Sequence, residues 1–170
     1  MADTLTLYKL IVLKMLDQID SPLSNSQISE FILEKEYTNY FTLQQVLSEM
    51  TETGLVTLSS SHNCSLYRIT ESGRNTLNFF GSKVSDAICS DIRSYLEENK
   101  VEIRNTLATT SDYFPGSNSD YLVRCQVKEQ NSTLIELTLS VPSEKQAVSV
   151  CNHWKEKSQE IYAYVMKSLL

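Results

Sequence analysis

One stretch of the chain, Tyr40–Gly73, constrains the fold more than any other, because it encodes a helix followed directly by two short strands. Its first part carries apolar residues at spacings of three and four, which predicts a helix with one buried face. The residues of this apolar stripe are Leu43, Val46, Leu47 and Met50.

Local signals set the ends of this helix. Thr42 is a good N-cap, and Gln45 three positions later completes a capping box, so two backbone amides of the first turn find partners. Gly54 stands where a helix C-terminus favours a positive φ. We therefore predict a helix over residues 42–53.

The second part of the stretch predicts a β-hairpin. The β-prone runs Leu55–Leu58 and Leu66–Ile69 are separated by a polar segment, residues 59–65, which suits a loose turn. A helix with such a hairpin directly behind it is the DNA-reading half of a winged helix-turn-helix. In this interpretation the helix over 42–53 is the recognition helix and the hairpin over 55–69 is the wing.

Two further helices are predicted before this stretch. Residues Leu5–Ile19 are apolar on more than one helical face, so this helix is either buried on several sides or packed against a partner chain. Ser24 opens the second helix, with Gln27 as its capping-box partner. Three helices followed by a two-stranded wing is the winged-helix order of elements, and we assign residues 1–80 to that domain.

Residues 81–170 are predicted to form a second, α+β domain for dimerisation or effector sensing. Helical spacing continues from Thr70, an N-cap, to about residue 105, with a break or kink at Gly81–Ser82. This pattern predicts a long connecting helix between the two domains. A long helix of this kind, together with the apolar first helix, favours a homodimer.

A β-meander and a final helix complete the predicted α+β fold. Three β-prone runs are joined by short polar turns, which indicates an antiparallel sheet with one solvated face. The runs lie at residues 106–114, 121–128 and 135–141. Ser143 and Gln146 form a third capping box, and the long C-terminal helix that follows is expected to cover the apolar face of the sheet.

The composition fits a globular protein, with 41% apolar and 21% charged residues. No apolar run approaches the roughly 20 residues of a membrane span, and we expect no secretory signal. The four cysteines are widely spaced without a C-x-x-C pair, which predicts reduced thiols in a cytoplasmic protein.

The net charge of −6 argues against a simple DNA-binding surface, because Lys and Arg supply much of the affinity for phosphates. Residues 1–80 hold five basic and nine acidic residues, so this half carries −4. The predicted DNA-reading half is therefore the more acidic half.

The residues expected to contact DNA lie on the outward face of the 42–53 helix and on the wing. Glutamine is a natural bidentate partner for adenine, and serine bonds several base edges. The candidates are Tyr40, Thr42, Gln44, Gln45, Ser48, Ser60, Ser61, His62, Asn63 and Arg68. Thr42 and the free amides of the first turn are expected to hold a phosphate. Glu49 and Glu52 share this face and would repel phosphates.

The sequence contains few residue patterns typical of a metal site or of an enzyme. His62-x-Cys64 and Cys151-x-His153 supply zinc-type ligands, but neighbours two apart on a helix point in different directions, so we expect neither metal nor cofactor. Two histidines, four glycines and no G-x-S-x-G or phosphate loop favour a protein that is not an enzyme. A small-molecule effector pocket between the sheet and the Trp154 helix remains an alternative hypothesis. The simpler interpretation of the apolar residues there is that they form the core.

A family resemblance covers nearly the whole chain. The run Phe31–Gln44 resembles a domain-of-unknown-function family of winged-helix proteins from Gram-positive anaerobes. The second half resembles the same family at Asp112–Phe114, Ala147, Cys151, Trp154–Lys155 and Ile161–Tyr162. The resemblance implies an N-terminal winged helix, a C-terminal α+β domain and a role in transcriptional regulation, without naming a catalytic residue or ligand. Thr70–Gly73 alone also resembles the turn after the wing in PadR- and MarR-type regulators.

Two functions are compatible with these patterns. The first is a cytoplasmic transcriptional regulator that binds DNA as a homodimer. The second is a winged-helix module for protein–protein interaction without DNA binding, favoured by the acidic charge and by a 42–53 helix that carries no Lys or Arg.

Overall fold

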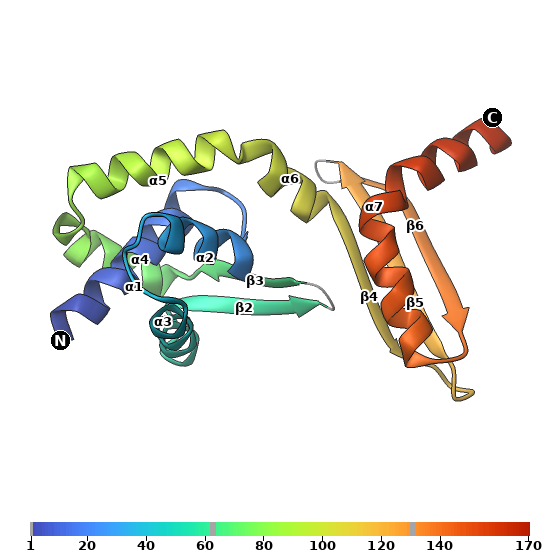
Figure 1. Cartoon of the computed structure of the whole chain (residues 1–170), viewed down its shortest axis with the longest axis horizontal. Coiled ribbons are helices and arrows are strands. Elements are labelled where there is room, and N and C mark those ends of the chain that lie inside the picture. Colours follow the sequence, from blue (N-terminus) through green and yellow to red (C-terminus); the bar gives the residue numbers. More distant parts are fainter. Residues whose placement is uncertain (1, 62–63, 130–131) are drawn as a thin grey trace. The chain divides into compact units, whose positions relative to one another are not determined.

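The computed structural model describes residues 2–61, 64–129 and 132–170, and it divides into two compact units (Figure 1). The first unit runs to Ser60 and continues over Cys64–Val101, and the second contains Glu102–Leu170. Each unit is described by itself. The chain is a mixed α+β protein with two three-stranded sheets.

The first unit consists of helices around a small sheet. Its elements are α1 (Ala2–Gln18), β1 (Leu23–Ser24), α2 (Asn25–Glu34), α3 (Tyr40–Glu52), β2 (Val56–Ser61), β3 (Cys64–Ile69), α4 (Glu71–Phe80), the 3-10 helix η1 (Gly81–Lys83) and α5 (Asp86–Glu98). The strand order is β1-β3-β2, with Leu23 opposite Tyr67 and Ser24 opposite Leu66. The short strand β1 was not predicted, because two residues are too few for an alternating pattern.

The predicted start of α2 is confirmed. The Ser24 hydroxyl accepts from the Gln27 amide at 3.1 Å, and the Gln27 side chain accepts from the Ser24 amide at 2.9 Å. These two bonds are the reciprocal pair of a capping box. Ser24 also ends β1, so the same residue fixes both the strand and the entry of the chain into α2.

The apolar first helix is buried within its own unit. α1 contacts α3, α4, α5 and β3, and its central apolar residues are at most 2% exposed. These residues are Leu10, Ile11, Val12, Leu13, Met15 and Leu16. Of the two explanations for an apolar pattern on several faces, burial therefore accounts for residues 10–16 without a partner chain.

The prediction of one long connecting helix is wrong. The helical pattern after Thr70 is divided among α4, η1, α5 and α6 (Lys100–Ala108). After η1, Val84 adopts an extended backbone, and Ser85 begins α5 by accepting from the Ile88 amide at 3.3 Å. A break or kink was predicted at Gly81–Ser82, where η1 lies, but the new helix start at Ser85 was not, because apolar residues at helical spacing run through it.

The helix α5 belongs to the first unit. The Tyr95 hydroxyl lies 3.0 Å from the Gln27 carbonyl oxygen and 2.9 Å from the Glu30 carboxylate, and its ring packs on Phe31 with centroids 5.3 Å apart. These contacts join α5 to α2. The sequence pattern places a boundary at residue 80, whereas the compact units meet between Val101 and Glu102.

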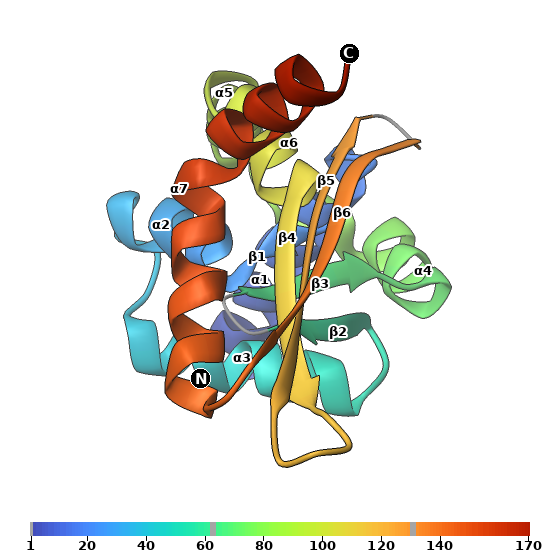
Figure 2. The ribbon, with the colours of Figure 1, turned by 90° about the vertical axis from the view of Figure 1, so that its right-hand side faces the viewer.

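The second unit is the predicted antiparallel meander with a long helix against it. Its elements after α6 are β4 (Thr109–Pro115), β5 (Tyr121–Glu129), β6 (Ser132–Val141) and α7 (Glu144–Leu169), and the strand order is β4-β5-β6. Figures 1 and 2 show α7 along one face of this sheet. Ser143 caps α7 as predicted, by accepting from the Gln146 amide at 3.3 Å, but the Gln146 side chain accepts from the Ser143 hydroxyl rather than closing a capping box.

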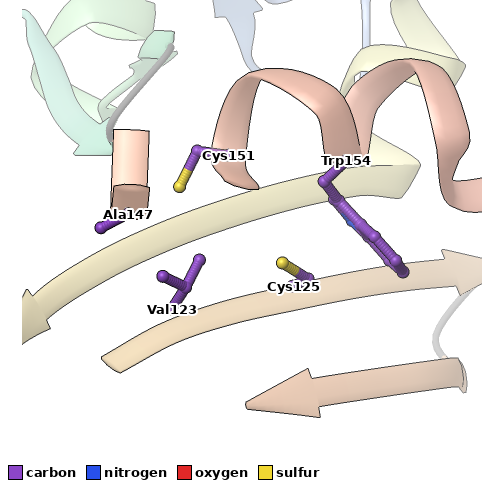
Figure 3. Packing of buried hydrophobic residues seen from close by; sticks show 5 residues of the cluster. All are labelled: Val123, Cys125, Ala147, Cys151 and Trp154. Atoms are coloured by element: carbon purple, nitrogen blue, oxygen red, sulfur yellow. The ribbon is translucent and has the colours of Figure 1, made fainter. Parts of the chain in front are cut away.

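The core of the second unit joins β5 to α7 (Figure 3). Val123 and Cys125 of β5 face Ala147, Cys151 and Trp154 of α7, and all five are buried. The Trp154 indole N–H donates to the Gln126 carbonyl at 3.2 Å. Burial, with a smaller contribution from Cys151, raises the pKa of the Cys125 thiol to about 11, so these sulfurs act as core atoms. Within the described residues, no helix is long and apolar enough to cross a membrane.

Candidate nucleic-acid interface

The helix α3 begins one turn earlier than its sequence predicts. Asn39 is the N-cap, and its side-chain oxygen accepts from the Thr42 amide at 2.9 Å. Thr42 is therefore the third residue of the helix, and the prediction of Thr42 as N-cap with Gln45 in a capping box is wrong. Asparagine and threonine both cap well, and the asparagine lies where the chain leaves the preceding turn.

This earlier start places two aromatic residues on the first turn of α3. Tyr40 is 50% exposed and Phe41 is 83% exposed, and their rings meet edge to face with centroids 5.9 Å apart. Tyr40 is one of the predicted contact residues, whereas Phe41 was not predicted. The aromatic pair Tyr40–Phe41 beside a possible helix start is visible in the sequence, but its exposure is not.

The buried face of α3 is the predicted one. Leu43, Val46, Leu47 and Met50 are all buried, and Gln45, Ser48 and Glu52 are exposed. The helix ends as predicted, since Gly54 has a φ of 77° and the Leu55 amide donates to the Met50 carbonyl at 2.9 Å. The chain then enters β2, so the outward face of α3 and the root of the hairpin lie in the same unit.

Gln44 is engaged inside the unit and differs in this respect from its neighbour Gln45. The Gln44 and Asn25 side chains exchange two hydrogen bonds, at 2.9 and 3.1 Å, and the Asn25 amide also lies 3.4 Å from the Tyr67 hydroxyl. The Ser29 hydroxyl donates to Asn25 at 3.0 Å. This polar cluster ties α3 to α2 and β3, so Gln44 holds the helix in place rather than facing solvent.

Gln45 belongs to a surface chain of polar contacts. Its amide donates to Glu49 at 3.1 Å, and the Lys9 ammonium of α1 lies 2.8 Å from the same carboxylate. The hydrogen bond from Lys9, and then that from Gln45, lowers the pKa of Glu49 below its ordinary value. The negative charge of Glu49 is thus paired with a cation, while Ser48 contacts Glu52 at 3.5 Å.

The hairpin carries the remaining predicted residues. Ser60 is exposed near the end of β2, and Arg68 is exposed on β3, where its carbonyl lies 3.5 Å from the Thr57 hydroxyl. Ser61 ends β2, but its side chain and all of His62 and Asn63 lie outside the described part of the structure. The predictions for these three side chains therefore stay predictions.

Most of the basic residues among the first 80 are paired. Lys35 lies 3.8 Å from Asp91, and Arg74 lies 3.6 Å from Asp17. Together with the Lys9 pair, three of the five basic residues in the first 80 contact carboxylates. Arg68 is the basic residue that the hairpin itself presents to solvent.

The two residues of zinc-ligand type on α7 have different surroundings. Cys151 is buried against the sheet, and His153 is exposed on α7, where its Nδ1 lies 2.8 Å from the Ser149 carbonyl oxygen. No group of three or more His, Cys, Asp or Glu side chains suited to a metal is found among the described residues.

A comparison with protein families places the chain. Residues 8–169 match the family model described as a domain of unknown function, DUF4364, and the chain belongs to this family. No curated protein and no solved structure matches the chain.

Proposed function

We propose that the first unit of this DUF4364 chain is a winged helix-turn-helix that binds double-stranded DNA, with α3 in the major groove and the β2–β3 hairpin as its wing. The order α1-β1-α2-α3-β2-β3, with β1 paired to β3, supports this assignment. The observation that carries the proposal is the division of α3 into a fully buried apolar stripe and an exposed polar face.

Within α3, we assign base reading to Gln45 and Ser48. To contact a DNA base, Gln45 has to break one surface hydrogen bond, the one to Glu49. Side-chain contacts four residues apart stabilise a helix by only about 0.2–0.5 kcal/mol. Gln44 would lose two bonds to Asn25, each contributing about 0.5–1.5 kcal/mol. A bidentate glutamine–adenine pair gives about 1–3 kcal/mol of discrimination, which exceeds the first cost.

The charge distribution supports weak and salt-sensitive binding. On α3, Lys9 offsets the charge of Glu49. The second carboxylate of the helix, Glu52, contacts Ser48 and would face the phosphates with its negative charge. We assign a phosphate contact beside the groove to Arg68, which is exposed on the hairpin. The second unit then serves dimerisation or effector sensing, and cysteines that form no disulfide within the described residues suit the cytoplasm.

A second candidate function is supported by a different observation. The first turn of α3 exposes Tyr40 and Phe41, and α3 carries no Lys or Arg. Exposed aromatics with few charges are typical of protein interfaces. In this alternative the same face of the first unit binds a protein partner.

Binding of labelled duplexes by the full chain separates the two functions. We expect affinity that falls steeply with salt, and a duplex selected by the protein from a random library to bind more tightly than the pool. Gln45→Ala should remove most of that preference, and Glu49→Lys should raise affinity for all duplexes.

The matched control is Glu156→Lys, which makes the same charge change at an exposed position of α7 in the second unit. If Glu49→Lys and Glu156→Lys raise affinity equally, charge alone is responsible and α3 is not the reader. If no duplex binds even at low salt, the DNA proposal is wrong and the protein-interface alternative stands.

A further inference from the structure

The two edges of the second sheet are protected to different degrees. β4 has seven residues, ends at Pro115 and packs closely against α7. β6 has ten residues, α7 packs mainly on β4 and β5, and no residue of β6 is fully buried. Proteins usually protect edge strands with proline, charge or a covering element, because an open edge offers unpaired N–H and C=O groups to another strand. β4 has such protection, and β6 has little.

The open strand has a regular segment with a strict alternation. The pairing of β6 with β5 is irregular beside Val127 and Lys128, and Pro142 follows the last residue, so the regular part of β6 is Ile135–Val141. The apolar residues of this segment share the α7 side of the sheet, since Leu137 lies opposite Cys125 and Leu139 opposite Val123. Leu139 is nevertheless 43% exposed.

We propose that Ile135–Val141 pairs antiparallel with the same segment of a second copy of this chain, around a two-fold axis at Thr138. Thr138 is the middle residue of the segment, so it would lie opposite its own copy. Apolar residues then face apolar residues, with Leu137 opposite Leu139 and Ile135 opposite Val141. Such an isologous contact joins two three-stranded sheets into one of six strands.

The charges of the segment fit this register. Glu136 is its single charged residue, and Arg124 donates to both of its oxygens at 3.2 Å, with Gln126 as a further donor. In the paired strands Glu136 lies opposite Ser140, and the two Glu136 residues are four positions apart along the strand. This separation of about 14 Å exceeds the Debye length of about 8 Å at physiological salt. Pairing therefore brings no two Glu136 carboxylates together.

The alternation makes the segment complementary to its own copy. A central Thr–Thr pair, two Leu–Leu pairs and two Ile–Val pairs follow from one sequence read in both directions, and such cross-strand pairs stabilise a sheet. The interface lies wholly in the second unit. It defines how the proposed regulator dimerises, but it does not depend on DNA binding by the first unit.

Sedimentation of the full chain over a range of concentrations tests the interface. We expect a dimer, and we expect Leu139→Lys to weaken dimerisation about tenfold or more, because the paired edge would have to accommodate an ammonium group without a partner. The control is Leu58→Lys, since Leu58 of β2 has the same exposed fraction, 43%, and lies in the first unit. A monomeric chain, or a dimer that both substitutions weaken equally, would overturn the proposal.

Oxidative cross-linking tests the register independently of stability. In a chain with Cys64→Ser and Cys89→Ser, Thr138→Cys places two sulfhydryl-bearing residues directly opposite, within the roughly 4.4–6.8 Å between Cα atoms that a disulfide requires. Ser140→Cys on the same face is the control, because its copy lies four positions away. We expect a cross-linked dimer for residue 138 and not for residue 140.

Equal cross-linking at both positions, or none at residue 138, would overturn the register and with it the proposed interface. The outcome is separable from the DNA proposal. A cross-linked dimer that binds no duplex supports this interface and contradicts DNA binding, whereas a monomer that binds duplex DNA does the reverse.

Discussion

The two units of this chain complete their cores in different ways. The first buries α1 on several sides, and it buries Phe31 of α2 against the rings of Tyr37 and of Tyr95 in α5. The second lays one helix over a three-stranded sheet and leaves the β6 side of the apolar face half exposed. The first unit thus completes its central core by itself, although it exposes aromatic side chains such as Phe41 and Phe79. The second unit has an open apolar edge and can gain stability from a second copy.

The largest expected effect, that of Phe31→Ala, tests whether the two units are stabilised separately. Phe31 is fully buried and contacts the rings of Tyr37 and Tyr95, so Phe31→Ala should cost about 3–5 kcal/mol in the free energy of unfolding. Trp154 is the single tryptophan and lies in the second unit. In urea, the circular dichroism transition of the first unit should shift while the Trp154 fluorescence transition stays in place.

Phe41→Ala is the control for this experiment, because Phe41 is 83% exposed and its loss should change stability by less than about 0.5 kcal/mol. If Phe31→Ala shifts both transitions equally, the two units unfold together and the comparison between them fails. If it shifts neither, the ring contacts of Phe31 do not stabilise the first unit as described.

A smaller effect separates the two glutamines of α3. Gln44→Ala should destabilise the first unit by about 1–2 kcal/mol, because it removes two hydrogen bonds and leaves Asn25 without them in a half-buried cluster. Gln45→Ala should change stability by less than about 0.5 kcal/mol. Urea unfolding followed by circular dichroism measures both. Equal losses for the two substitutions would contradict the assignment of one residue to structure and the other to recognition.

The glutamines also show what sequence could and could not predict. The apolar stripe of α3, the Ser24 capping box, the left-handed Gly54 and the meander were predicted, because each depends on residues close together in the chain. The inward use of Gln44 was not, because its partner Asn25 is 19 positions away and only the tertiary fold brings the two amides together.

Competition between good local signals explains the remaining errors. Asn39 and Thr42 both make suitable N-caps, and the sequence does not rank them. The connecting segment keeps helical spacing across Val84, although the Ser85 cap starts a new helix there. The short strand β1 depends on pairing with β3 rather than on its own two residues. The two caps are local, whereas the strand β1 depends on a partner more than 40 positions away in the chain.

A further prediction concerns the link between the turn after α2 and α5. The Tyr37 hydroxyl donates to Asp91 at 2.8 Å, and burial, followed by the hydrogen bond and the charge of Asp91, raises the pKa of Tyr37 from 10.0 to about 12. The unfolded chain loses this proton more easily than the folded chain. The stabilisation is therefore complete below pH 10 and is lost as the pH rises through about 12.

Tyr37→Phe tests this link. It should cost about 1 kcal/mol at neutral pH, below the roughly 1.5–3 kcal/mol of a bond to a charged group, because the site is partly solvated. The difference from the unsubstituted chain should shrink between pH 10 and pH 12. Unfolding free energies across that range measure it, and a difference that stays constant would show that Tyr37 ionises equally in both states.

The smallest expected effect on stability concerns the ion pair of Lys9 and Glu49 at the surface of α3. Lys9 and Gln45 lower the pKa of Glu49, so the carboxylate stays charged in the folded chain at a pH where the unfolded chain is protonated. Its contribution to stability is present above the ordinary pKa of 4.5 and is lost as the pH falls through the lower folded value. Lys9→Met should return the carboxyl titration, followed by NMR, toward 4.5 with little change in unfolding. The same substitution removes the cation that offsets Glu49, so duplex binding should weaken as well.

If Lys9→Met moves the titration but leaves duplex binding unchanged, the charge of Glu49 does not face DNA. The helix α3 would then have to contact its partner through the exposed aromatic residues Tyr40 and Phe41.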